Sequence, residues 1–421
     1  MDGDPSVEPQ LDSFSLTLPL PYRCALIIVA GTLSSSAIDV LWLTPSSGLG
    51  LGRQPADVPA LIRYPGRQSL TEATHHLSTY RLATILSGSL GLSLVTFWIF
   101  SHRDAELVIF YDWMPMTYLL FLAILFILPL RYHSTTGRYH FLKTLRRVSV
   151  GGIAEAKDGK FGDILLADVL TSYSKILADL FISICMFLTT NGSATEQPDR
   201  RCGGRFLVPL IIAIPSAIRF RQCLIEYGRV RNANHRSTSL VSTGSGGVHL
   251  ANALKYATAF PVIILSAMQR SSSDASTAAT AAEVSLYRLW LLAVIVNSLY
   301  SFYWDVANDW DLTLLSPARS NPEHPYGLRR KMVFRASEIY YVAIALDFLL
   351  RITWTLKLSP HLDQFNDWEG GIFCIQALEV FRRWIWIFFR VETEWVRNTS
   401  TGLGQDDILL GDYSSGKDDD D

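Results

Sequence analysis

Charge is scarce in this sequence. Only 18% of its 421 residues are Asp, Glu, Lys or Arg, whereas 49% are hydrophobic, and the mean hydropathy is +0.21. Such a composition is typical of an integral membrane protein and excludes an ordinary soluble enzyme. The formal net charge of −2 and the lack of any nucleic-acid motif also exclude a nucleic-acid-binding protein.

Cysteine is rare as well, with no CxxC pair and no histidine at metal-ligand spacing. The five cysteines are Cys24, Cys185, Cys202, Cys223 and Cys374. Four of them fall in apolar segments, so we expect small buried side chains, no disulfide and no metal site. GxSxG, HExxH and paired catalytic aspartates are also missing from these segments, which makes an intramembrane hydrolase the least favoured function. We therefore expect neither an enzyme nor a bound cofactor.

Long apolar windows are abundant, and they predict an all-α, polytopic membrane protein with about nine transmembrane helices. The expected spans are 22–44, 80–101, 112–131, 163–190, 206–227, 249–269, 284–306, 335–358 and 371–391. The first would be an uncleaved anchor, because the preceding residues lack the order of a cleavable signal peptide. The fourth is the weakest, since Asp168, Lys175 and Asp179 interrupt it, and we expect one helix with a single polar face.

Basic residues favour alternate loops, a bias that predicts membrane orientation. Loop 132–162 is rich in Lys and Arg, loop 270–283 has almost none, and loop 191–205 is an exception with several arginines. With nine spans, this places the N-terminus in the lumen and the C-terminus in the cytosol. The amphipathic, basic segment 139–150 would lie along the cytosolic membrane surface, with a plain solvated helix as the alternative. The expected domains are a luminal tail (1–21), N-terminal helices with an amphipathic linker (22–160), a six-helix transport domain (161–395) and an acidic cytosolic tail (396–421).

The last expected span carries two adjacent arginines near its middle. An arginine at the bilayer centre costs about 2.5–3.5 kcal/mol on insertion scales, so it must face a bundle interior, a partner or a water-filled path. Helical spacing places Glu379, Arg382, Arg383, Trp386 and Arg390 on one side of this helix. Such a cationic stripe has the chemistry of an anion site.

Charged residues also occur in the other C-terminal spans. Each alone could be a buried ion pair that fixes helix packing, as the spacing of Asp347 and Arg351 allows. Together, acids and bases on facing helices exceed what packing needs, and each has a desolvation cost. Guanidinium groups match oxyanions bidentately, so these residues predict a carrier or channel for a small oxyanion. They do not choose among phosphate, sulfate and carboxylate.

Three strings resemble motifs of the EXS-domain family, which includes a eukaryotic phosphate exporter and a yeast Golgi protein. They are FYWDVANDW (302–310), ALDFLLRITWTL (345–356) and EVFRRWIWIFFRVETE (379–394). Weaker matches, in the family order, are LADVL (166–170), IRFRQCL (218–224) and LANALKYATAF (250–260). The resemblance covers about 160–395.

This likeness implies which residues form a phosphate pathway. They are Asp168, Arg219, Lys255, Tyr256, Asp305, Asp309, Arg351, Glu379, Arg382 and Arg383. Trp354 would act as a gate, and Trp386 is a second bulky residue able to gate or line the passage.

The chain also departs from the exporter. Residues 1–21 cannot hold the regulatory SPX domain, three spans rather than four precede the shared six, and a Ser/Gly-rich stretch fills 237–247. These features resemble the Golgi branch, which implies return of luminal phosphate to the cytosol in support of glycosylation and protein retention. The alternative is a non-transporting scaffold for glycosyltransferase recycling. Expected partners are inorganic phosphate, the lipid bilayer, that recycling machinery and a second copy of the chain.

Overall fold

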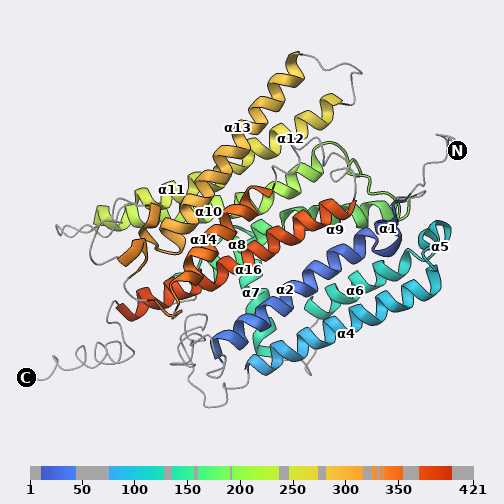
Figure 1. The fold of residues 1–421 in the computed structure, drawn as a ribbon, viewed down its shortest axis with the longest axis horizontal. Coiled ribbons are helices and arrows are strands. Elements are labelled where there is room, and N and C mark those ends of the chain that lie inside the picture. Colours follow the sequence, from blue (N-terminus) through green and yellow to red (C-terminus); the bar gives the residue numbers. More distant parts are fainter. Residues whose placement is uncertain are drawn as a thin grey trace, which may run out of the picture.

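The computed structural model confirms the all-α prediction for the residues that it describes (Figure 1). These are 11–43, 75–127, 135–155, 160–189, 192–236, 246–273, 281–315, 325–329, 332–334, 336–353 and 369–400. Long helices lie side by side, and α16 (Glu369–Ser400) runs between an N-terminal and a C-terminal group. It contacts α2 of the first group and α8, α14 and η3 of the second.

The N-terminal group is built from three long apolar helices. They are α2 (Leu20–Leu43), α4 (His75–Ser101) and α6 (Trp113–Ile127), with the short α5 (Ala105–Phe110) between the last two. Tyr22 is fully buried among them and its hydroxyl lies 2.7 Å from Ser93 Oγ. A short helix, α1 (Ser13–Thr17), packs against α16, so this part of segment 1–21 is not a free tail.

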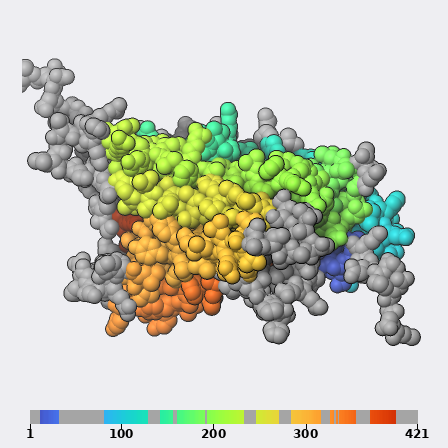
Figure 2. Space-filling model, turned by 90° about the horizontal axis from the view of Figure 1, so that it is seen from above, coloured from blue at the N-terminus to red at the C-terminus, as the bar shows by residue number. Residues whose placement is uncertain are grey.

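The C-terminal group carries most of the charge. Its helices are α8 (Lys160–Ser172), α9 (Ser174–Leu188), α10 (Leu207–Arg236), α11 (Gly247–Ala257), α12 (Ala259–Ser273), α13 (Ala281–Trp304), the π-helix η3 (Asp305–Asp309), the 3-10 turns η4 (Thr313–Leu315) and η6 (Pro325–Gly327), and α14 (Glu338–Arg351). The helix α7 (Thr135–Ser149) connects the two groups. Seen from above, α10 to α13 form much of the visible surface, and little of α16 is visible (Figure 2).

Every expected span coincides with helix, at least in part. Five described helical segments are long and apolar enough to cross a membrane: Arg81–Ser101, Ala105–Ile127, Leu207–Asn232, Gly247–Arg270 and Val284–Asp309. The pair α8 and α9 makes a sixth if it counts as one span. The chain is therefore a multi-pass membrane protein, whereas the number nine stays a prediction.

The fourth expected span is not the single straight helix that we predicted. At Tyr173 the axis bends by 61°, which separates α8 from α9. The bend leaves Lys175 exposed and turns Asp179 toward Gln376 of α16. The predicted polar face therefore ends at Ser172, because a bend changes the helical phase of every residue beyond it.

The prediction that no disulfide forms is wrong. Cys185, near the end of α9, is bonded to Cys202 in the loop that precedes α10, and Cys374 is exposed rather than buried. The same loop carries Arg200, whose Nη2 donates to Glu369 at 2.8 Å. Glu369 also accepts from Arg23 Nη1 at 2.6 Å, so the braced loop joins the first turns of α2 and α16.

We expect Cys185→Ser and Cys202→Ser each to lower the free energy of unfolding by about 3 kcal/mol, because the bond closes a short loop. Thermal unfolding of the detergent-solubilised chain, followed by tryptophan fluorescence, measures the change. Cys374→Ser is the control and should leave the midpoint unchanged. A reductant that destabilises the double serine variant as much as the unmodified chain would contradict this assignment.

Candidate functional site

The expected pathway residues converge on the inner side of α16. Besides α16 itself, the contributing elements are α8, α10, α11, η3 and α14. Nearly all of these side chains are buried, and each carboxylate accepts from at least one cation. The arrangement is one connected network of charge rather than a set of separate pairs.

Arg382 lies at the centre of this network and is 3% exposed. Its guanidinium donates to Glu379, one turn earlier on α16, at 2.6 and 3.0 Å. It also donates to Asp347 of α14 at 3.0 Å and lies 3.5 Å from Asp305 of η3. Because the five N–H donors of arginine form a rigid fork, this one side chain holds three elements together.

A π-helical turn positions the next two acids. Trp310 N–H donates to the carbonyl of Asp305 across five residues, at 2.9 Å. In this wider turn Asp305 and Asp309 lie on the same side, and Lys255 donates to them at 2.8 and 3.1 Å. Asp305 is also paired with Arg351, which in turn bonds Asp347 at 3.1 Å. Single π-turns of this kind are frequent at functional sites.

A second corner of the network centres on Asp168 of α8. Its carboxylate accepts from Arg219 Nε at 2.7 Å and from the Tyr256 hydroxyl. Lys255 precedes Tyr256 on α11, and its ammonium lies 5.5 Å from the centroid of the Tyr256 ring. The end of α11 therefore joins the Asp168 corner to the Asp305 corner.

Arg383 differs from the other cations of the network. It forms no ion pair with the described residues, although it is only 6% exposed. Its Nε donates to Ser172 Oγ at 2.9 Å and its Nη2 to Thr171 Oγ1 at 3.2 Å. The Ser172 hydroxyl donates onward to Glu379 at 2.8 Å, which links Arg383 to the network through a neutral group.

Two buried donors at this place have no acceptor among the residues that the structure describes. One is Nη1 of Arg383 itself, and the other is Nε1 of Trp386, whose side chain is completely buried. The guanidinium lies over the Trp386 ring, 4.6 Å from its centroid. A buried donor left unsatisfied costs about 1–3 kcal/mol, so two together mark a place that lacks an acceptor. An oxyanion is a ligand that supplies several acceptor oxygens and a compensating charge.

The network comes nearest to the surface at Glu379. Its side chain is 38% exposed, against 16% for Asp309, 4% for Asp168 and 1% or less for Asp305 and Asp347. Glu379 is therefore the most accessible of these five carboxylates. No group of three or more His, Cys, Asp or Glu in the described parts of the chain is arranged to hold a metal ion.

The two expected gates have different outcomes. Trp354 lies outside the described residues. Trp386 is packed in the core, where its carbonyl accepts from Trp310 Nε1 at 3.3 Å. Its role as a gate stays a prediction.

Several residues of the network were absent from the predicted set. Asp347 had the correct spacing to Arg351, but that spacing also fits a simple packing pair. Thr171, Ser172 and Gln222 are neutral, so charge could not mark them. The only sequence signal for Ser172 is its position one turn after Asp168 on the polar side of α8.

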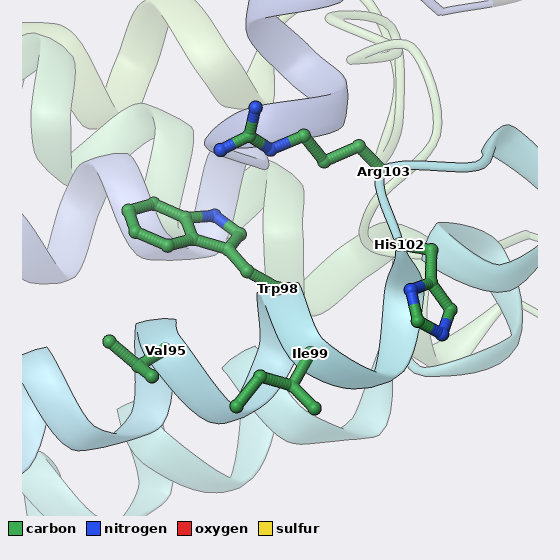
Figure 3. A pocket seen from close by; sticks show the side chains of 5 residues that line it. All are labelled: Val95, Trp98, Ile99, His102 and Arg103. Carbon is green, nitrogen blue, oxygen red and sulfur yellow. The ribbon is translucent and has the colours of Figure 1, made fainter.

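A separate pocket lies at the end of α4, lined by Val95, Trp98, Ile99, His102 and Arg103 (Figure 3). The Arg103 guanidinium lies 5.8 Å from the Trp98 ring, and the indole N–H donates to the Thr17 carbonyl at 2.7 Å. None of the lining residues belongs to the charged network, and Arg103 is exposed.

Replacing the two adjacent arginines should have unequal effects on stability. Arg382→Ala would leave Glu379, Asp347 and Asp305 with less compensation and should cost about 3–5 kcal/mol of unfolding free energy. Arg383→Ala removes a cation without an acidic partner and should cost less than half as much. Thermal unfolding in detergent without added phosphate measures both, and equal losses would contradict the assignment.

Comparison with known proteins shows the family of the chain. The model of the EXS family matches residues 18–396, which includes the N-terminal helices. Protein ERD1 homolog 2 of Schizosaccharomyces pombe is 30% identical over 89% of this chain and 96% of its own length. Protein ERD1 of Kluyveromyces lactis is 32% identical over 59% of this chain and 62% of its own length. Solute carrier family 53 member 1 of Mus musculus is 30% identical over 68% of this chain but only 39% of its own length. The chain belongs to the EXS family.

Proposed function

We propose that this protein is a phosphate transporter of the Golgi membrane that returns inorganic phosphate from the lumen to the cytosol. One observation carries the proposal: in the described part of the chain, the buried Arg383 guanidinium has no acidic partner and lies beside a second unsatisfied donor, Trp386 Nε1. A membrane protein that needed only packing would have no use for this arrangement. The solute-carrier relatives support a transported ligand, and the resemblance to the phosphate exporter supports phosphate.

The binding chemistry follows from charge compensation. Arg219, Lys255, Arg351 and Arg382 are each held by carboxylates, so their net attraction for an incoming anion is reduced. The charge of Arg383 is not paired with a carboxylate of the described residues, so it can attract an anion. Its Nη1 can donate to one phosphate oxygen while Trp386 Nε1 donates to a second oxygen. Binding stays weak enough for release because the nearby acids repel the anion, as passage through a membrane requires.

The cations that are paired with carboxylates could bind the phosphate after it leaves Arg383. A guanidinium can exchange a carboxylate for a phosphate without changing its hydrogen-bond geometry, since both present paired oxygens. In this scheme Arg382, Arg351 and Lys255 would pass the anion along by temporary release of Asp305 or Asp347. The acids retain the cations in position when no phosphate is present.

The disulfide supports the proposed orientation. Cys185–Cys202 lies at the end of the bundle where α2 and α16 begin. Disulfides persist in the lumen of secretory compartments and are rare on the cytosolic side. This end would therefore be luminal, which supports an N-terminus that lies in the lumen. The Golgi location itself rests on the resemblance to the Golgi branch of the family.

Phosphate flux tests the function directly. The purified full-length chain is reconstituted in vesicles, and uptake of radioactive phosphate is measured over a range of concentrations. Arg383→Gln should abolish saturable uptake, and Trp386→Phe, which keeps the ring but removes one donor, should raise the half-saturation concentration at least about tenfold. Arg103→Gln, at an exposed site on α4, should leave uptake unchanged.

Two results would overturn the proposal. Uptake equal to that of protein-free vesicles would favour the scaffold alternative. Uptake that is saturable but insensitive to Arg383→Gln and Trp386→Phe would leave a transporter whose site lies elsewhere.

Orientation has its own test. Sealed Golgi vesicles that carry the Cys374→Ser chain are treated with a membrane-impermeant reductant and then, after lysis, with a polyethylene-glycol maleimide in denaturant. Cys24 and Cys223 react in every sample, and we expect two further adducts only when detergent is present during reduction, because the bond would face the lumen. Reduction in intact vesicles would instead place this end in the cytosol.

A further inference from the structure

The helix α7 (Thr135–Ser149) bridges the two groups of the bundle and lies across the long helices rather than along them (Figure 1). Toward its first half, the Phe141 ring lies 6.3 Å from that of Phe126 at the end of α6. At its other end, Val148 is fully buried against Ala167 and Ile218, from α8 and α10. A helix held at its middle and in its last turn in this way is part of the fold and not a loosely solvated linker.

The outer side of α7 combines exposed basic and apolar groups. Lys143 and Arg146 are exposed on this side, and Val150, the residue just after the helix, keeps 64% of its surface accessible. Basic residues with neighbouring apolar side chains suit the boundary between lipid headgroups and acyl chains. Juxtamembrane Lys and Arg are attracted to anionic lipids of the cytosolic leaflet, each by about 1 kcal/mol.

The segment that follows α7 is fastened to α8 and α10. The chain turns at Gly151, whose φ of +72° suits glycine. The backbone N–H of Gly152 then caps the end of α7 by donating to the Arg147 carbonyl at 2.9 Å. Arg147 and the N–H of Ala154 both donate to Asp163, which is fully buried at the start of α8. Arg229 of α10 donates to the carbonyls of 153 and 154 at 2.8 and 2.9 Å.

One residue connects this segment to the charged network. Gln222 of α10 is fully buried, and its Nε2 donates to the Gly152 carbonyl at 2.8 Å. Its Oε1 accepts from Arg219 Nη1 at 2.9 Å, and Arg219 holds Asp168. A single amide therefore links the end of α7 to the Asp168 corner, so a shift of α7 changes the support of Arg219.

We propose that α7 binds an anionic phospholipid of the cytosolic leaflet through Lys143 and Arg146, and that its occupancy controls phosphate passage through Gln222 and Arg219. The lipid-binding part stands on the surface of α7, whereas the assignment to the cytosolic leaflet and the control part rest on the proposed function. Phosphatidylserine is the probe for the headgroup class, with phosphatidylcholine as the neutral reference.

The test separates binding from control. Native mass spectrometry of the full-length chain in detergent measures phosphatidylserine retention, and flux is measured in phosphatidylcholine vesicles with and without 20% phosphatidylserine. Lys143→Glu/Arg146→Glu should weaken retention at least about tenfold and remove the response of flux to the lipid. Arg103→Glu/Arg288→Glu, which makes the same change of charge at exposed sites elsewhere, should preserve both. Gln222→Leu should keep retention but lose the response.

The outcomes are distinguishable. Equal retention by the α7 variant and its control would overturn the lipid site, whatever the flux. Retention that depends on α7 while no variant or wild-type chain moves phosphate would uphold the lipid site and overturn the proposed function. A flux response that survives Gln222→Leu would overturn the control through Gln222 alone.

Discussion

The free-energy cost of burying Arg382 in the bundle interior determines how the surrounding helices must be arranged. An uncompensated charge there would lose several kcal/mol of solvation, so carboxylates must reach it from other elements. Glu379 comes from its own helix, but Asp347 and Asp305 arrive from α14 and η3. The π-turn that follows α13 contributes to this compensation, because it positions Asp305 to pair with Arg382 and Arg351 while Asp309 pairs with Lys255.

Arg383 is the exception, because no carboxylate of the described residues pairs with it. The adjacent arginine on the same helix turns toward the Ser172 and Thr171 hydroxyls, which satisfy donors but bring no negative charge. Hydroxyls in place of carboxylates keep the guanidinium available for an anion. In the proposed transport, a full complement of acids would leave no cation for an anion, and a lack of them would hold the anion too tightly for release.

Much of this could be predicted from the sequence, because hydropathy windows and helical spacing are local properties. They located the helices and placed Arg382, Arg383 and Trp386 on one side of α16. Features that depend on contact between distant elements could not be predicted in this way. The bend at Tyr173 interrupts a plausible apolar helix without a proline, and the Cys185–Cys202 bond joins a helix to a polar loop without a recognisable motif. The unsatisfied donors of Arg383 and Trp386 become visible only when every neighbouring acceptor is placed.

The two ends of the bundle are held by different chemistry, and this bears on where it can move. At the end where α16 begins, a disulfide braces the loop whose Arg200 shares Glu369 with Arg23. The segment after α7 is held by non-covalent contacts instead: Gln222 and Arg229 donate to its carbonyls, and Arg147 and the Ala154 N–H donate to the buried Asp163. Alternating exposure of a central site needs contacts that can exchange at low cost. The end that is held without a covalent bond is also the end that reaches Arg219. A rearrangement there would alter the network while the braced end stays in place.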